Sequence, residues 1–256
     1  MATTPEPKTH IAYHTNEAIY VRDVDLVKDL IGKVSFTEMM FFQITGTRPS
    51  PAQVALLDAV LVTLMEHGFT PSVIATRMIY ISAPEALQSA VAAGLLGVGS
   101  TFVGTMENAA KLLDEILSAP EGEEARAKAI ATRYRETRQP LPGFGHHLHK
   151  PDDPRSPRLI ALAQEYKTPG HHIRALKTLS AAIDAVYGRH ITINATGAIA
   201  AVLGEIGFPQ EVMRGVAVVS RAAGLVGHIL EEQREPAARF IWDLAEHQVP
   251  YEPDKM

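Results

Sequence analysis

The sequence predicts a mainly α-helical fold, and three observations support this. Apolar residues recur three and four positions apart along most of the 256 residues, which places them on one face of a helix. Alternating β-branched runs are scarce, and residues 191–193 (Ile-Thr-Ile) are the one good strand candidate. Proline and glycine cluster between the periodic segments. We therefore expect an all-α protein.

The expected helices follow one another along the chain. The first, Pro51–Met65, begins at a Ser-Pro pair, and proline is favoured at the first position of a helix. The segment 121–138 combines helix formers with many charges, so we expect it on the surface. The further expected helices are Ala83–Leu96, Phe102–Leu117, Glu121–Arg138, Arg158–Tyr166, Arg174–Tyr187, Gly197–Ile206 and Gln210–Glu232.

Two stretches must leave the helical conformation. Residues 139–145 and 150–157 are rich in proline, and the first also carries two glycines. No repeat at a solenoid period and no glycine–serine linker is present. If there are two domains they are therefore interleaved, with 105–190 as a small domain and 1–104 plus 191–256 as a large one.

Composition excludes several classes of protein. The net charge of −5 argues against nucleic-acid binding, and the absence of cysteine rules out disulfides, thiolate nucleophiles and Cys-ligated metals. The first ten residues do not resemble a secretory signal, and the apolar run around Leu95 and Leu96 is too short for a bilayer. P-loop, GxSxG and HExxH motifs are missing. We expect a soluble, cytoplasmic protein without a membrane partner.

The densest polar cluster is the segment 146–155, with three histidines, one lysine, two aspartates and one arginine. His146 can give or take a proton near neutral pH, and Arg155 can hold a carboxylate through two parallel hydrogen bonds. Glycines 143 and 145, expected to be exposed, would let a ligand approach the main chain.

Two other interpretations of this loop stay open from the residues alone. His146 and His149 with Asp152 or Asp153 could bind zinc. The charges could also belong to a solvated loop without a function.

Three smaller clusters have both structural and functional interpretations. His67 ends an apolar helix, where a capping or core role is common. Asn194 and Thr196 lie where a helix begins, so either side chain could cap that helix or face a ligand. Arg221 lies in an apolar helix and needs an anionic partner, either a carboxylate of the protein or a ligand.

At this point the residues show a family resemblance. The pattern Pro142-Gly-Phe-Gly-His146, Lys150 and Asp153-Pro-Arg155 resembles the signature of the citrate synthase superfamily. Weaker agreement extends from about 34 to 239, in the segments 34–46, 49–50, 66–77, 94–102, 220–224 and 227–228. The chain looks closest to the citryl-CoA lyase module, which also forms the C-terminal end of ATP-citrate lyase.

The resemblance implies an all-α fold with a large and a small helical domain. It implies a homodimer or larger homo-oligomer whose clefts use both subunits. Coenzyme A would enter as part of the substrate and product, with no tightly bound cofactor and no metal. The implied reaction splits citryl-CoA, or a related 3-hydroxy-3-carboxyacyl-CoA, into acetyl-CoA and a 2-oxo acid such as oxaloacetate.

The resemblance also assigns roles to residues. His146 would take the proton of the tertiary hydroxyl, and His67 would hydrogen-bond the oxo acid. Arg155 and Arg221 would hold carboxylates, and Arg234 or Arg239 would reach into the partner's cleft. Other residues implied in substrate or coenzyme A binding are Arg77, His228, Gly143, Gly145, His149 and Lys150.

Two positions depart from the citrate synthase pattern. Phe102 stands where citrate synthases have a histidine, and Thr196 stands where the family has its catalytic aspartate. Thr196, Asn194 or a bound water would then stabilise the thioester enolate. These departures keep two alternatives open. The protein could act on a different hydroxyacyl-CoA, as a lyase or synthase, or it could bind a CoA thioester or carboxylate without catalysis.

Overall fold

The computed structural model of the protein describes residues 6–99, 101 and 103–253, and it confirms the all-α prediction. Phe102 lies outside these residues. The helices are α1 (Phe36–Thr45), α2 (Pro51–Met65), α3 (Pro71–Ser82), α4 (Leu87–Leu96), α5 (Met106–Leu117), α6 (Glu123–Thr137), α7 (Arg155–Glu165), α8 (His171–Tyr187), α9 (Ala195–Glu205), α10 (Met213–Arg234) and α11 (Ala238–Gln248). Shorter turns are the π-helical η1 (Leu26–Leu30) and the 3₁₀ segments η2 (Val103–Thr105) and η3 (Gln210–Val212).

The strand prediction was wrong. Within the described residues the only sheet has three short antiparallel strands, β1 (Ala12–His14), β2 (Ile19–Val21) and β3 (Val24–Asp25), in the order β1-β2-β3. The predicted strand at 191–193 contributes one isolated bridge, between Ile193 and Phe144. A two- or three-residue strand is too short for alternation to reveal it in the sequence.

The helix starts follow local sequence where a cap is nearby. Ser35 forms a capping box with Glu38 before α1, and Ser50 forms one with Gln53 before α2. Asn194 caps α9 by accepting a hydrogen bond from the main-chain N–H of Gly197. The sequence predicted α2 at its exact bounds, from the Ser50-Pro51 pair and the spacing of the apolar residues that follow.

Other helix starts depend on distant residues, and there the sequence prediction was off. Helix α8 begins at His171 instead of Arg174, because Glu205 on α9 accepts main-chain hydrogen bonds from Gly170 and Ile173. Helices α4 and α7 begin a few residues from the expected positions, and α11 was not predicted.

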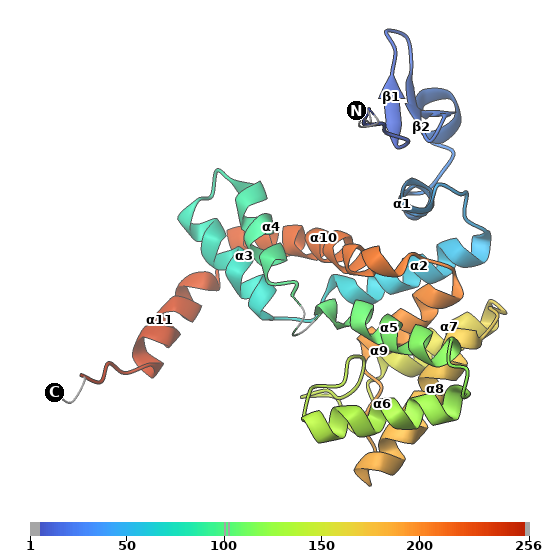
Figure 1. Ribbon diagram of the computed structural model, residues 1–256. Helices are drawn as coiled ribbons and strands as arrows, with labels where there is room; N and C mark the ends of the chain where they lie inside the picture. Colours follow the sequence, from blue (N-terminus) through green and yellow to red (C-terminus); the bar gives the residue numbers. More distant parts are fainter. Residues whose placement is uncertain (1–5, 100, 102, 254–256) are drawn as a thin grey trace, which may run out of the picture.

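Helix α9 is the centre of the molecule. It packs against α5, α7 and α8 (Figure 1). Helices α2 and α10 run side by side, and α10 also packs against α3 and α4. All residues of α9 except Gly204 are buried, which its alanine and glycine content allows. The same hydrophobic core extends from Met40 to Ala217. The division into a domain of 105–190 and a domain of 1–104 plus 191–256 stays a prediction.

Helix α10 with η3, Gln210–Arg234, is long and apolar enough to cross a membrane by length and composition alone. Here it packs against α2, α3, α4 and α5. Val216 and Leu225 are fully buried within the protein, and Arg221 and Glu232 are almost fully buried. Core helices pass the same length test, so this segment is weak evidence of a membrane span.

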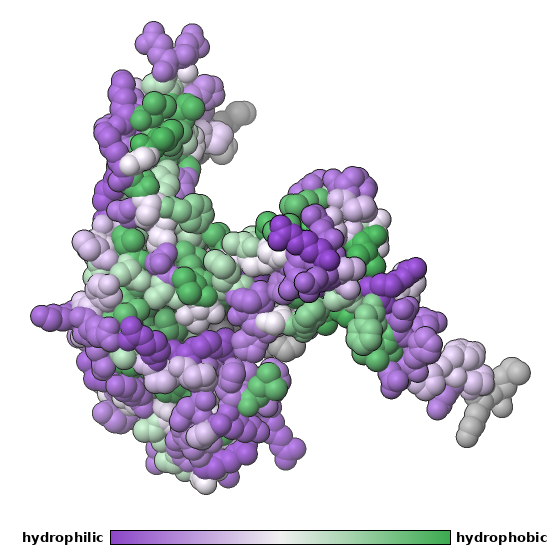
Figure 2. Space-filling model, turned by 180° about the vertical axis from the view of Figure 1, so that it is seen from behind, coloured by the Kyte–Doolittle hydropathy of each residue, from purple (hydrophilic) through white to green (hydrophobic). Residues whose placement is uncertain are grey.

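Two parts project from the helical body. The N-terminal sheet with α1 projects on one side, and α11 on another (Figure 1). Phe240, Trp242 and Leu244 on α11 are between 48% and 68% exposed, and Phe36 on α1 is 72% exposed. Apolar surface is visible over the N-terminal projection and the adjoining body (Figure 2). These exposed side chains provide apolar surface without a partner in the described chain.

Candidate active site

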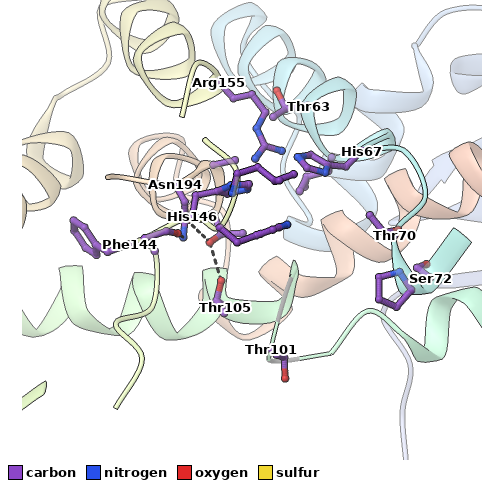
Figure 3. Close-up of a pocket in the computed structure, with 18 of the residues that line it drawn as sticks. Thr63, His67, Thr70, Ser72, Thr101, Thr105, Phe144, His146, Arg155 and Asn194 are labelled. Atoms are coloured by element: carbon purple, nitrogen blue, oxygen red, sulfur yellow. Dashed lines mark hydrogen bonds between the residues drawn. The ribbon is translucent and has the colours of Figure 1, made fainter. Parts of the chain in front are cut away.

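A cavity of about 630 Å³ lies where five parts of the chain meet (Figure 3). Its walls come from the junction of α2 and α3, the segment between α4 and α5, the loop between α6 and α7 with the first residue of α7, the first turn of α9 and one residue of α10. The polar side chains in the walls belong to Thr63, His67, Thr70, Ser72, Thr101, Thr105, His146, His147, Arg155, Asn194, Thr196 and Arg221. All four clusters singled out from the sequence thus contribute to one cavity.

His146 is held in one hydrogen-bonding state. Its Nδ1 accepts the main-chain N–H groups of Leu148 (3.1 Å) and His149 (3.0 Å). Burial, together with the neighbouring His149, lowers the pKa of His146, so the ring is neutral near pH 7. A neutral imidazole carries one proton, and because Nδ1 is an acceptor that proton is on Nε2. His146 therefore offers an N–H donor.

His67 lies two residues beyond the end of α2, and its ring centroid lies 5.8 Å from that of His146. The carboxylate of Glu66 accepts the main-chain N–H groups of His67 (2.8 Å) and Gly68 (2.7 Å), which fixes this turn. Burial lowers the pKa of the His67 imidazole, and the charge of Arg155 lowers it further. His67 is therefore also neutral near pH 7.

His149 completes a group of three imidazoles. Its ring centroid lies 4.4 Å from that of His146 and 5.7 Å from that of His67. One ring nitrogen from each of these histidines lies within 4.8 Å of the other two. The cluster joins a residue after α2 to two residues of a loop almost eighty positions later, a proximity that no local pattern predicts.

The zinc set considered from the sequence is not assembled. Asp152 pairs with His190, at 2.9 Å from its Nε2. Asp153 is fully buried and faces Arg155. Neither aspartate joins the histidine cluster.

Arg155 is anchored by Asp153 through two parallel bonds, from Nε to Oδ1 (2.9 Å) and from Nη2 to Oδ2 (2.8 Å). Burial raises the pKa of Asp153, but the hydrogen bonds and charge of Arg155 outweigh it and lower the pKa to about 2. The carboxylate is thus ionised, and Arg155 is fixed in the wall of the cavity.

Arg221 has unused hydrogen-bonding capacity. It is 4% exposed, and its Nη2 donates to the main-chain oxygen of Leu64 (3.1 Å). Its Nε and Nη1 are buried without a partner in the structure. Burial lowers the pKa of this guanidinium, with the charge of Glu66 opposing. A buried cation with unpaired donors at a cavity wall is suited to a carboxylate ligand.

The opposite side of the cavity carries hydroxyl groups. Thr196 Oγ1 donates to Asn194 Oδ1 (2.7 Å) and lies 2.7 Å from Thr105 Oγ1, which must then be the donor of that pair. Asn194 Nδ2 donates to the main-chain oxygen of Gly145 (2.9 Å). Among the described residues that line the cavity there is no aspartate or glutamate. This wall can position a water or a thioester oxygen, but it holds no carboxylate base.

Arg77 and His228 are not among the residues that line the cavity, and their role in substrate binding stays a prediction. Arg77 is fully buried and pairs with Glu232 (2.7 Å) and with Glu231. His228 Nδ1 lies 2.9 Å from Arg77 Nη2, and its Nε2 lies 2.8 Å from Glu66. The Nη atoms of Arg77 and both ring nitrogens of His228 thus face protein partners, and through Glu66 these contacts support the turn before His67.

The remaining predicted residues have different positions. Gly145 is exposed and lines the cavity, whereas Gly143, expected to be exposed, is buried against α9. A Cβ on Gly143 would lie 2.8 Å from the Cα of Gly197, so this glycine permits close packing of loop and helix. Exposed Lys150 and the ring of His149 are not part of the cavity wall.

Arg234 and Arg239 are exposed and lie outside the cavity of their own chain. The Arg239 guanidinium lies over the ring of Trp242, 4.9 Å from its centroid. Their role in a partner's cleft stays a prediction.

Sequence reasoning missed three contributors to the site. Asp153 was considered as a metal ligand and not as the anchor of Arg155. Thr105 and the link between Glu66 and His228 were not assigned a role. An aspartate two residues before a ligand-binding arginine is the one local signal that could have indicated such an anchor.

The chain matches the family model described as "Citrate synthase, C-terminal domain" over residues 9–241. It is 27% identical to a putative citrate synthase 2 from Mycobacterium bovis, over 75% of this chain and 52% of the relative. The chain therefore spans about half the length of the curated relatives it matches first. Since the family model covers most of the chain, the chain belongs to the citrate synthase family.

Solved structures show the same fold. The citryl-CoA lyase from Hydrogenobacter thermophilus has 31% sequence identity and a TM-score of 0.87, covering 97% of this chain and 95% of that chain. ATP citrate lyase from Methanosaeta concilii, in complex with (3S)-citryl-CoA, has 18% identity and a TM-score of 0.79, covering 100% of this chain and 43% of that chain. At that identity the second likeness shows the fold alone.

Proposed function

We propose that this member of the citrate synthase family is a citryl-CoA lyase-like enzyme. It splits citryl-CoA, or a related 3-hydroxy-3-carboxyacyl-CoA, into acetyl-CoA and oxaloacetate or another 2-oxo acid. The observation that carries the proposal is the cavity in which Arg221, with two unpartnered nitrogen atoms, joins Arg155 and neutral His67 and His146. The near full-length similarity to a citryl-CoA lyase supports cleavage as the reaction.

The two arginines account for the acid part of the substrate. Guanidinium groups bind carboxylates through paired hydrogen bonds, and each is fixed before the substrate arrives, Arg155 by Asp153 and Arg221 by Leu64. Oxaloacetate carries two carboxylates, so it can engage one on each arginine. His67, placed between them and His146, donates a hydrogen bond to the oxo acid as it forms.

His146 acts on the oxygen at the reacting carbon. Its Nε2–H is preorganised as a donor, so it stabilises the alkoxide that forms when the hydroxyl proton leaves and that becomes the carbonyl oxygen as the carbon–carbon bond breaks. The family resemblance assigned it the removal of the hydroxyl proton. Its lone pair at Nδ1 already accepts two main-chain hydrogen bonds, so the structure favours the donor role.

The thioester part of the substrate would lie against the hydroxyl wall. Thr196 occupies the place of the family's catalytic aspartate, and with Asn194 and Thr105 it can orient a water near the enolate. Coenzyme A would enter with the substrate, with Gly145 and Lys150 at the exposed loop as its contacts. No tightly bound cofactor is part of this proposal.

A homodimer would explain the exposed apolar surface. Phe240, Trp242 and Phe36 lie on the projecting parts of the chain, where a second copy can cover them. Arg234 or Arg239 would then reach the partner's cavity. Sedimentation velocity measures this directly, with a dimer expected and a monomer at micromolar concentration as the contrary result.

A second candidate is a protein that binds CoA thioesters without cleaving them. It is favoured by one observation, the lack of a carboxylate among the described lining residues. A third possibility is a lyase or synthase for another hydroxyacyl-CoA whose enolate is easier to form.

A substrate panel separates these candidates. The purified protein is incubated with citryl-CoA and with other 3-hydroxyacyl-CoA thioesters, and the released CoA thioester and oxo acid are identified by mass spectrometry. Release of acetyl-CoA with oxaloacetate supports the proposal. Cleavage of another thioester alone changes the substrate, and thermal stabilisation by every thioester without cleavage establishes the binding role.

A further inference from the structure

The cleavage proposed above leaves the hydroxyl proton without an acceptor. For the carbon–carbon bond to break, the tertiary O–H bond must also break, and its electron pair becomes part of the new C=O bond. His146 cannot take this proton at Nε2, because that atom already carries one, and its Nδ1 lone pair faces two main-chain N–H groups. A second group must receive it.

The three imidazoles provide a place for one oxygen atom. Their nearest ring nitrogens lie within 4.8 Å of one another. Three atoms no farther apart than this share a point at most about 2.8 Å from each, so one oxygen atom can lie at hydrogen-bond distance from all three. A hydroxyl oxygen there meets a nitrogen of His67, of His146 and of His149 at once. His67 and His146 also line the cavity, so this point lies at its edge.

His67 is a poor acceptor at this point. Burial lowers the pKa of its ring, and the positive charges of Arg155 and Arg221, which also act on it, further disfavour a second proton. Those arginines are fixed in the walls by Asp153 and Leu64. His67 is thus suited to stay neutral and donate a hydrogen bond.

We propose that His149 is the proton-accepting catalytic residue of this site. This inference rests on the proposed cleavage activity and moves His149 from the coenzyme A-binding role that the sequence assigned. In cleavage, a ring nitrogen of His149 takes the hydroxyl proton, while the electron pair of the broken carbon–carbon bond goes to the thioester enolate. The enolate carbon takes a proton from water, and the His149 imidazolium neutralises the hydroxide, so no net proton is consumed.

The same geometry argues against a metal ion between the three rings. His146 could ligate a metal through Nε2 only after losing the proton there, and Nδ1 would then have to carry a proton against two main-chain donors. The cluster is thus better suited to an oxygen atom than to a cation.

The test is His149→Ala, assayed with the substrate that the wild-type protein cleaves. The main-chain N–H of residue 149 still donates to His146 in this variant, so the state of His146 is retained. We expect kcat to fall on the order of 10²–10⁴-fold, as for removal of a general base. Added imidazole should restore part of the rate, which a purely structural defect would not allow. Exposed His171, at the start of α8, provides the control variant His171→Ala.

Two further measurements keep the inference open to refutation if His149→Ala folds poorly. His149→Gln keeps much of the side chain's volume but cannot take the proton, so it should lose kcat to a similar degree. Long-range ¹H–¹⁵N spectra of the histidine-labelled protein, assigned with His146→Gln, should show the Nε2–H form of His146 at pH 7. An Nδ1–H form of His146 would overturn the inference.

The outcomes separate the two proposals. If the wild-type protein cleaves no hydroxyacyl-CoA, the proposed function fails. If it cleaves one and His149→Ala keeps the wild-type kcat, the function stands and the role of His149 is refuted. Loss of kcat without rescue by imidazole, in both His149 variants, would also refute the role.

Discussion

Asp153 joins Arg155 to the first residue of α9. Its two oxygens accept both bonds of the guanidinium, and Oδ2 also accepts the main-chain N–H of Ala195 (3.0 Å). The loop that carries His146 and the helix that carries Thr196 are therefore fixed to each other by one fully buried carboxylate. The two walls of the cavity depend on this contact.

Replacing this carboxylate should cost stability in a pH-dependent way. Its pKa is lowered from 3.8 to about 2, so its ionised form stabilises the fold at neutral pH by about 2 kcal/mol. Because the folded-state pKa is the lower one, this contribution is complete above about pH 4 and is lost as the pH falls towards 2. We expect Asp153→Asn to lower the free energy of unfolding at pH 7 and to differ less from wild type near pH 3.

Urea unfolding at the two pH values measures this difference. The matched control variant is Asp23→Asn, at an exposed aspartate. Its free energy of unfolding should change little at either pH. An equal loss for Asp153→Asn at both values would contradict the assigned ion pair.

The two buried arginines should respond in opposite ways to the same substitution. Arg221 has two buried nitrogen atoms without a partner, so Arg221→Met should raise the free energy of unfolding of the ligand-free protein by on the order of 1 kcal/mol. Arg77 neutralises Glu232, whose side chain is 1% exposed. Arg77→Met should therefore lower the free energy of unfolding by about 3–5 kcal/mol. Chemical denaturation compares the two.

Ligand binding completes this comparison. Oxaloacetate or citrate should raise the melting temperature of the wild-type protein and have no effect on Arg221→Met. A stabilised Arg221→Met that still binds both acids would show that Arg221 is not a substrate residue.

The close approach of the His146 loop to α9 requires glycine at two positions. A Cβ on Gly143 would lie 2.8 Å from the Cα of Gly197, with main-chain atoms on both sides. We expect Gly197→Ala to cost about 1–3 kcal/mol and to reduce activity, because the loop must move. Gly227 on α10 has open space at its Cβ position, so Gly227→Ala should be neutral or stabilising by up to about 1 kcal/mol. Similar unfolding curves for the two variants would contradict this account.

The helical segments and the four functional clusters could be predicted because their signals are local. The capping pair Ser50 and Gln53 defines the start of α2, and the spacing of His146, Lys150 and Arg155 identifies the loop. The contacts of His149 with His67 and of Asp153 with Ala195 could not be predicted, since the partners are far apart in the sequence. The ion pair of Arg77 could not be predicted either, because its partner Glu232 lies on another helix.

The central claim is that this cavity cleaves citryl-CoA. The direct measurement is the release of oxaloacetate and acetyl-CoA from citryl-CoA by the purified protein, with His146→Ala as the control. The account predicts cleavage by the wild-type protein and a fall in kcat on the order of 10²–10³-fold in the variant, as expected when a preorganised donor to a developing oxyanion is removed. Absence of cleavage, or equal cleavage by both proteins, would contradict it.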